Sequence, residues 1–266
     1  MIRFFDAHNH LQDDRLADRW SELVATAHSA GVARMVVNGA TVEDWPLVAD
    51  LAQRFPDIVQ PSFGLHPWYL HEQPADWEPL LRAALDRFPT AGVGEIGLDR
   101  WKPELPWDGQ EALFAAQLRI AAERDRPASI HCLKAWGPLL AVLENTSRPA
   151  RGFLLHSYGG SAEMIPRFAK LGAYFSLPGY FAHAHKARQR DTFRHVPLDR
   201  LLIETDAPDQ ALPADRIAHP LADRAGNAIN HPANISAVYA FAAEWLGQPI
   251  EMLAEQVEEN FHRLFG

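Results

Sequence analysis

The sequence predicts an α/β protein of a single domain, residues 1–266, folded as a (β/α)8 TIM barrel. Three observations support this fold class. The length of 266 residues suits one such barrel without a second domain. Short apolar segments alternate with amphipathic ones from end to end, an order typical of a parallel sheet. The rival fold, an open doubly wound sheet, is disfavoured because no glycine-rich phosphate-binding motif follows the first apolar segment.

The apolar segments supply the strands that such a barrel needs. They span residues 3–8, 34–39, 58–64, 91–97, 128–131, 152–156, 173–176 and 200–205. Helical spacing of apolar residues predicts helices between them, such as those over 19–30, 77–88, 110–124 and 135–144. Two further helices, 234–246 and 250–264, close the chain, and we expect residues 207–232 to be irregular.

The composition is that of a globular protein. Hydrophobic residues make up 47% of the chain and charged residues 22%, which excludes a disordered or fibrous class. No apolar run approaches the roughly 18 residues that span a bilayer, and Asp6 lies where a signal peptide would need its apolar stretch. Cys132 is the only cysteine, which excludes an internal disulfide and a cysteine-based zinc ribbon. We expect a soluble cytoplasmic protein that needs no membrane and no obligate protein partner.

Charge bears on the possible partners. The net charge is −9 with histidine counted as neutral, whereas proteins that hold duplex DNA mainly by neutralising phosphates are usually basic. An acidic enzyme that acts on nucleic acid therefore needs metal ions and a few local cations to hold the phosphate.

Histidines and carboxylates gather at the predicted strand ends. The carboxyl ends of the strands meet at the mouth of a barrel, where active sites of this fold class lie. Residues two apart on a strand face the same way, so Asp6, His8 and His10 are all expected to point into the mouth. Later strands end on Glu95, His131, His156 and Asp206, and the third strand adds His66.

Such a set suits two divalent ions, which need about three ligands each and a bridging carboxylate or water. His8 and His10 form a pair, Glu95 bridges, His131 and His156 bind the second ion, and Asp206 binds the first. A single strand-end histidine is more often an ordinary core residue. Six such groups buried together without metal would repel one another, at a cost of several kcal/mol. The mixture of imidazoles and carboxylates leaves zinc, magnesium and manganese open.

These residues carry a resemblance to the TatD family of metal-dependent hydrolases, within the amidohydrolase superfamily. The matching pieces are segments 6–10, 64–67, 94–99, 204–208 and 259–265, with His131 and His156. The resemblance implies a TIM barrel, a divalent metal site on the six ligands above, and hydrolase activity, reported for most characterised members as that of a deoxyribonuclease. Many superfamily relatives bridge their metals with a carboxylated lysine at the fourth strand, where this chain has Glu95.

The chain also departs from the family pattern after the eighth strand. Many members carry Tyr-Leu-Ala-Pro-like and Lys-Arg-Asn-Glu-Pro-like segments there. Residues 209–213 read Asp-Gln-Ala-Leu-Pro and residues 228–232 read Ala-Ile-Asn-His-Pro. The basic pair has become Ala228 and Ile229, and the glutamate has become His231, so substrate preference is the open question.

The predicted catalytic residues are Asp206, Glu95 and His66. A water activated by the metals would attack, and Asp206 would act as general base as well as ligand. His66 would contact substrate or protonate a leaving group; the alternative is that it only fixes the turn before Pro67. We expect Asp6 to orient the neighbouring histidines from behind rather than to bind metal.

Residues around the mouth are candidates for substrate contacts. Arg100 could clamp a phosphate, as could Lys102, while Trp101 and Tyr158 could stack a nucleobase. The same rim holds further aromatic residues, Trp68, Tyr69, Trp136, Tyr180 and Phe181. The simpler interpretation is that these rings pack the loops together.

Two other features have competing interpretations. The basic segment 185–195 could be a phosphate track, but it is more often a solvated helical face. Cys132 follows His131 on a strand, so its side chain should face the opposite way and be buried rather than catalytic.

The leading functional hypothesis is a metal-dependent phosphodiesterase, a deoxyribonuclease that trims single-stranded DNA ends. The closest alternative keeps the barrel and the metals but cleaves an amide, ester or lactone in a small molecule, and the net charge and altered loop favour it. A third possibility is a metal-binding protein without catalysis; the full ligand set argues against it.

Overall fold

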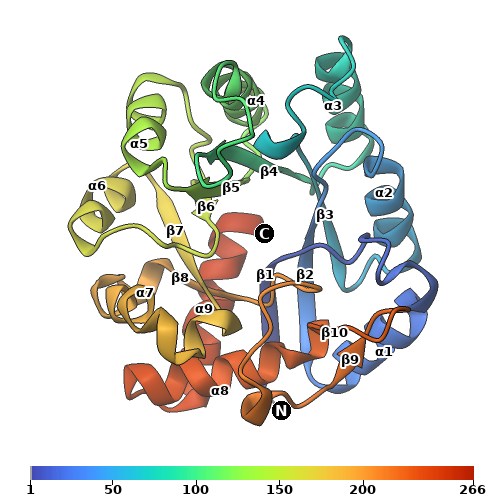
Figure 1. Ribbon diagram of the computed structural model, residues 1–266, viewed down its shortest axis with the longest axis vertical. Coiled ribbons are helices and arrows are strands. Elements are labelled where there is room, and N and C mark those ends of the chain that lie inside the picture. The colour runs from blue at the N-terminus through green and yellow to red at the C-terminus, as the bar shows by residue number, and fades with distance from the viewer. Residues whose placement is uncertain (1) are drawn as a thin grey trace.

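The computed structural model describes residues 2–266 and has eight parallel strands in sequential order (Figure 1). This confirms the predicted barrel. The strands are β1 (Phe4–Asn9), β2 (Val32–Asn38), β3 (Val59–Phe63), β4 (Gly92–Asp99), β5 (Ala128–Leu133), β6 (Phe153–Leu155), β7 (Ala173–Pro178) and β8 (Leu201–Glu204). Each predicted strand overlaps one of them, with ends that differ by a few residues.

Two backbone hydrogen bonds join the carboxyl ends of the first and last strands. The Asp206 amide donates to the His8 carbonyl at 3.0 Å, and the His10 amide donates to the Ala207 carbonyl at 2.8 Å. Three of these four residues, His8, His10 and Asp206, are predicted metal ligands. Closure of the barrel therefore sets the distance between the His8–His10 pair and Asp206.

Helices surround the strands (Figure 1). They are α1 (Trp20–Ser29), α2 (Trp45–Arg54), α3 (Trp77–Arg87), α4 (Gln110–Glu123), α5 (Trp136–Asn145), α6 (Ile165–Lys170), α7 (Ala187–Thr192), α8 (Ile235–Leu246) and α9 (Ile250–Phe265). The apolar pattern did not single out α2 or α6. The six residues of α6 are too few to display a helical period, whereas α2 does carry apolar residues at helical spacing, Trp45, Val48, Leu51 and Ala52. Among residues 2–266 no helix is long and apolar enough to cross a membrane.

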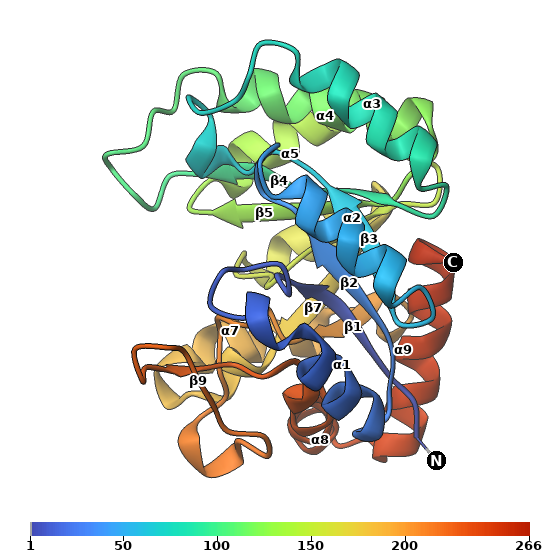
Figure 2. The same cartoon turned by 90° about the vertical axis from the view of Figure 1, so that its right-hand side faces the viewer.

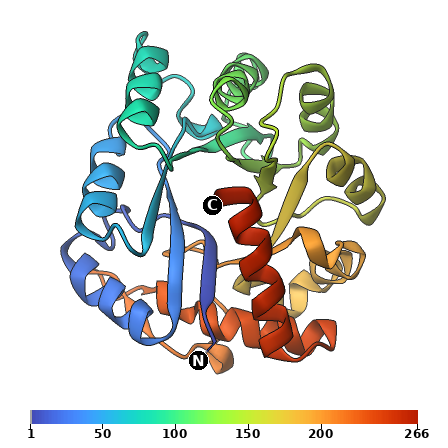
Figure 3. The same cartoon turned by 180° about the vertical axis from the view of Figure 1, so that it is seen from behind.

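The last helix covers one end of the barrel. Figure 3 shows α9 lying across the end at which the strands begin. The ring of Phe261 lies 4.9 Å from that of Phe5, and the Asn260 side chain donates to the carbonyls of Leu198 and Leu201, both at 2.7 Å. The opposite end, where the strands finish, therefore remains for ligands.

Two long connections lie at that opposite end. Figure 2 shows the β4–α4 connection and β9 on the side away from both termini. The segment after β8, expected to be irregular, contains an antiparallel ribbon of β9 (Leu221–Ala222) and β10 (Ala228–Ile229). The carboxylate of Asp223 closes its turn by accepting from the amides of Ala225 and Asn227. Strands of two residues carry no readable period, which is why the sequence pattern missed them.

Cys132 is buried, as its position on β5 predicted. Burial raises the pKa of its thiol, so the reactive thiolate is suppressed. The structure therefore opposes a catalytic role for this cysteine.

Candidate metal centre

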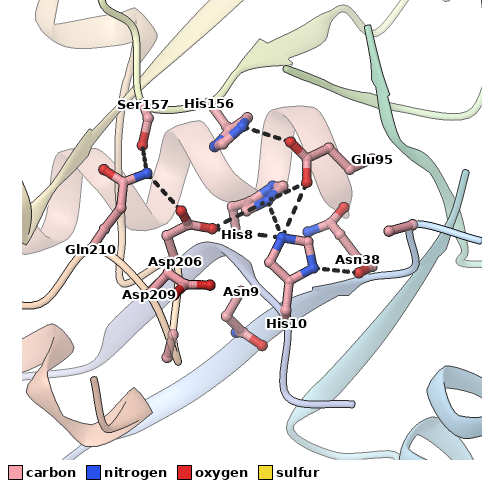
Figure 4. A network of polar contacts seen from close by, with 12 residues as sticks. His8, Asn9, His10, Asn38, Glu95, His156, Ser157, Asp206, Asp209 and Gln210 are labelled. Atoms are coloured by element: carbon pink, nitrogen blue, oxygen red, sulfur yellow. Dashed lines mark hydrogen bonds and ion pairs between the residues drawn. The ribbon is translucent and has the colours of Figure 1, made fainter. Parts of the chain in front are cut away.

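Four of the other predicted ligands, all histidines, surround the carboxylate of Glu95, which is only 3% exposed. Figure 4 shows three of them, His8, His10 and His156, together with Asp206. One carboxylate oxygen, Oε2, lies 3.1 Å from His10 Nε2 and 3.5 Å from His8 Nε2. The other, Oε1, lies 3.0 Å from His131 Nδ1 and 2.8 Å from His156 Nε2. Glu95 therefore has one oxygen for each pair of histidines, the geometry expected of a bridging ligand.

Asp206 completes the cluster and offers an atom that has no hydrogen-bond partner. Its Oδ1 is buried without a donor and lies 3.6 Å from the Nε2 atoms of both His8 and His10. A buried carboxylate oxygen that faces imidazole nitrogens is costly unless a proton or a cation lies among them. The donor set therefore fits a divalent metal.

The way in which the residues group differs in part from the expected division. Three sets have ligand atoms that all lie within 4.8 Å of one another: His8–His10–Glu95, His8–His156–Asp206 and His66–Glu95–His131. The first agrees with the predicted site. In the other two, His156 groups with His8 and Asp206, and His131 groups with His66. The rings of His8 and His156 stack with centroids 4.1 Å apart, which explains the second set.

Burial and neighbouring charges shift the acid–base behaviour of the cluster. Burial, together with the nearby His156, lowers the pKa of His8 to about 4. A histidine that stays neutral at pH 7 keeps a lone pair for a metal. Burial raises the pKa of Asp206 to about 6, although His156 and His10 oppose this rise. Burial alone would raise the pKa of Glu95, but the surrounding histidines hold it well below its usual value.

Hydrogen bonds behind the cluster orient two of the imidazoles. The Nδ1 of His10 lies 2.8 Å from the Asn38 carbonyl, and the Nε2 of His131 lies 2.8 Å from Asp99 Oδ2. Each of these ring nitrogens must donate, because its partner can only accept. The other nitrogen of each ring faces Glu95 and would offer a lone pair to a metal once the ring is neutral. Metal-binding histidines commonly use such partners.

Sequence reasoning did not assign roles to Asp99 or Glu204, although a signal for both was available. Asp99 lies four residues after Glu95 on β4, and Glu204 lies two residues before Asp206. The alternation of a strand places each pair on one face. Glu204 is fully buried, accepts hydrogen bonds from Ser157 and Ser176, and lies 3.6 Å from His156 Nδ1.

Asp6 orients His8 from behind as expected, but its hydrogen bond goes to the backbone amide and not to the imidazole ring. Its carboxylate accepts from the amide and hydroxyl of Thr205 at 2.9 and 2.5 Å, from the Asn9 side chain at 3.1 Å, and from the His8 amide at 3.3 Å. It therefore ties the end of β1 to the end of β8 and positions His8 only through the backbone. Burial raises the pKa of Asp6 to about 7.

His66 caps a turn and also faces Glu95. Its Nδ1 accepts from the Trp68 amide at 3.2 Å and so caps the short 3-10 helix Pro67–Tyr69. Its Nε2 lies 3.4 Å from Glu95 Oε1, and burial lowers its pKa to about 4. His231 repeats only the first arrangement, accepting from the Ala233 amide at 2.9 Å. The residue that replaces the family's glutamate is therefore a cap.

Two aromatic residues of the rim, Trp136 and Tyr158, pack against each other. Tyr158, an expected substrate contact, is fully buried, and its hydroxyl donates to the Ser161 carbonyl at 2.8 Å. Its ring contacts those of Trp136 and Phe175. Tyr158 therefore offers no face to a substrate, and that expectation is wrong. Trp101, by contrast, is 50% exposed.

The cations near the mouth lie on aromatic rings. The Arg100 guanidinium is 3.6 Å from the Trp107 ring centroid, and the Lys102 ammonium is 3.5 Å from that of Trp68. In the basic segment 185–195, Arg190 and Arg194 both lie over Trp245 of α8, at 4.5 and 4.2 Å. These two arginines hold α7 and the 3-10 turn that follows it against α8, which favours the structural interpretation over a phosphate track.

Comparison with known proteins places this geometry in a family. The family model described as "TatD related DNase" matches residues 5–266. The chain is 30% identical to the 3'-5' ssDNA/RNA exonuclease TatD of Pantoea ananatis over 263 residues, covering 98% of this chain and 99% of the relative. It is 32% identical to the protein of the same name from Edwardsiella piscicida over 249 residues, covering 92% of each.

A solved structure agrees with this. The crystal structure of YjjV, a TatD homologue from Escherichia coli K12, superposes with a TM-score of 0.88 at 28% identity, covering 99% of this chain and 98% of the other. YjjV itself is named an uncharacterized metal-dependent hydrolase. Because the family model covers nearly the whole sequence, this chain belongs to the TatD-related DNase family.

Proposed function

We propose that this chain is a divalent-metal-dependent hydrolase that cleaves phosphodiester bonds and takes single-stranded nucleic acid, DNA first of all, from an end. The observation that carries the proposal is the unpartnered Asp206 Oδ1 facing the histidines around Glu95. The names of the relatives, 3'-5' ssDNA/RNA exonuclease and metal-dependent hydrolase, support the same reaction. We further propose that residues 1–266 form one domain and that the enzyme works in the cytoplasm.

Two ions would be held by the cluster, and zinc, magnesium and manganese all suit its ligands. His8, His10 and Asp206 would hold one, His131 and His156 the other, and Glu95 both. When bound, the ions would supply an activated water and neutralise charge on the attacked phosphoryl group.

The side chains of this chain would then have separate tasks. Asp206 would accept the proton of the attacking water through Oδ1, the oxygen with no other partner. His66 keeps an N–H on Nε2, because its Nδ1 lone pair accepts from Trp68. That N–H points toward Glu95 and is placed to donate to a substrate oxygen or a leaving group.

Residues around the mouth of the barrel would hold the nucleic-acid strand. Trp101 is exposed and could stack a terminal base, and Arg100 could contact a phosphate. With a net charge of −9, such local contacts rather than the whole-molecule field must retain a polyanion.

A paired assay tests this function. Bound metal is counted by elemental analysis, and release of mononucleotides from a short single-stranded DNA is followed with magnesium, manganese or zinc. We expect release that requires metal and is lost in His8→Ala and Glu95→Ala. His28→Ala is the matched control, because that histidine is exposed on α1. Release that persists in both cluster variants would contradict the proposal.

The second candidate is hydrolysis of an amide, ester or lactone in an uncharged small molecule. The net charge of −9 favours it, and Arg15, which lies beside the loop after β8, is already paired with Asp13 and Asp209. Metal bound in stoichiometric amounts with no nucleotide release, but with turnover of such esters, would select this alternative.

A further inference from the structure

A chain of hydrogen bonds leads from Asp206 to the loop after β6 (Figure 4). The side-chain amide of Gln210 donates to Asp206 Oδ2 at 2.6 Å and to Ser157 Oγ at 2.7 Å. The Ser157 hydroxyl donates in turn to Glu204 Oε1 at 2.5 Å. This network, Asp206–Gln210–Ser157–Glu204, joins the two loops on either side of the metal centre.

We propose that Gln210 is a positioning residue that decides which oxygen of Asp206 faces the metal centre. The inference rests on the proposed function and adds a residue that neither motif nor metal chemistry assigns. Gln210 lies in segment 209–213, where the chain departs from its family's usual pattern.

The donors and acceptors of Gln210 and Ser157 allow only one orientation of the Gln210 amide. An amide nitrogen has two hydrogens, and Gln210 uses one on Asp206 and the other on Ser157. The Ser157 hydroxyl gives its only proton to Glu204, so it can only accept from Gln210. Turning the amide around would point its oxygen at a carboxylate. The neighbours therefore hold Gln210 in one orientation.

The consequence for Asp206 is that its two oxygens are not equivalent. Oδ2 is engaged by Gln210, whereas Oδ1 has no partner and lies 3.6 Å from His8 Nε2 and from His10 Nε2. Without Gln210 the carboxylate could rotate and present either oxygen or both. Gln210 thus leaves a single oxygen of Asp206 facing the centre before a metal ion binds.

The backbone of the same residues is held in an uncommon conformation. Asp206, Gln210 and Ser157 have φ values of +53°, +49° and +44°. They are three of the five non-glycine residues between positions 2 and 266 that adopt positive φ. Residues with side chains avoid this region unless their surroundings enforce it, and such residues cluster at functional sites. All three side chains belong to the same network.

The test replaces Gln210 with leucine, which has a similar volume and no donor. We expect the apparent affinity for Mn²⁺ to fall about 10- to 100-fold, the range for residues that orient a metal ligand. We expect kcat on single-stranded DNA to fall with little change in KM, because the substrate contacts lie elsewhere. Gln53→Leu is the matched control, since that glutamine is exposed on α2. If Gln210→Leu does not fold, Gln210→Met serves the same test.

A purely structural tie between the loops predicts something different. It would lower the Tm of the metal-free protein while leaving Mn²⁺ affinity and kcat unchanged, and that result would overturn the proposal. A double-mutant cycle with Ser157→Ala adds a second check: the two losses in Mn²⁺ affinity should be less than additive, because both variants act on one network.

The metal titration also separates this inference from the proposed function. If the unmodified protein binds Mn²⁺ but releases no nucleotide, the nuclease function fails while the role of Gln210 is still decided by Mn²⁺ affinity. Wild-type Mn²⁺ affinity in Gln210→Leu, beside an active parent enzyme, would refute the inference alone.

Discussion

Single residues behind the ligands set how the histidines present their nitrogens. Asp99 accepts from His131 Nε2 at 2.8 Å and from the Trp68 indole at 2.7 Å. The hydrogen bond fixes the ring so that Nδ1, not Nε2, faces Glu95. A buried imidazole without such a partner could turn or adopt the other tautomer. The carboxylate of Asp99 therefore supports the candidate metal centre by holding His131, one of the predicted ligands.

Asp99→Asn tests this at the residue scale. The amide still fills the space but can present an N–H to His131, which would favour the wrong tautomer. We expect Mn²⁺ affinity to fall roughly 10- to 100-fold, measured by titration of the metal-free protein. Asp57→Asn, at an exposed aspartate, is the control. Equal Mn²⁺ affinities in the two variants would show that Asp99 does not support metal binding.

Among the elements, α9 has a distinct task, because it closes the end of the barrel opposite the metal centre (Figure 3). Its apolar face buries Phe261, Leu264 and Phe265. The Asn260 amide satisfies two carbonyls just before and at the start of β8. Stability and chemistry are thus placed at opposite ends of the same strands, as is usual for this fold class.

The variant Phe261→Ala tests the separation of stability from metal binding. Removing a fully buried phenylalanine costs about 3–5 kcal/mol of unfolding free energy, which denaturant titration measures. Metal affinity of the folded variant should remain that of the parent protein. Met252→Ala, at a methionine that is 60% exposed on the same helix, should change neither quantity. A loss of metal affinity without a loss of stability would show that the two ends are coupled.

At the scale of the whole molecule, the net charge of −9 opposes a polyanionic substrate. A nucleic-acid strand must then be held by the few cations around the mouth of the barrel, and its binding must weaken as the salt concentration rises. For single strands, the slope of log affinity against log salt is about −0.7 per phosphate contact. Salt dependence therefore counts the phosphates that the rim holds.

Arg100→Ala should lower the slope of log KM against log salt by about 0.7, the loss of one phosphate contact. Steady-state kinetics on a short single-stranded DNA over a range of salt concentrations measures this. Arg87→Ala is the matched control, because Arg87 also lies on an aromatic ring, that of Phe88, but on α3 outside the mouth. An unchanged slope would mean that Arg100 contacts no phosphate.

Much of the centre was predictable because the relevant rules are local. Strand alternation placed His8 and His10 on one face, and the strand-end rule placed Glu95 and Asp206 at the mouth. The same alternation pointed to Asp99 and Glu204, yet a carboxylate behind a histidine looks no different in sequence from one beside a metal. The prediction that Tyr158 contacts substrate was wrong for a related reason. The sequence does not distinguish a loop aromatic that faces solvent from one that packs against the next loop.

The sequence by itself therefore determined the barrel, the strand ends and which histidines and carboxylates gather at the mouth, since each follows from periodicity over a few residues. Only the tertiary structure decided how the ligands share Glu95, that His66 both caps a turn and faces the centre, and that Gln210 holds Asp206. Gln210 and Ser157 are 53 residues apart in the chain, and their contact depends on where two loops lie after the barrel has closed. No local pattern encodes a distance of that kind.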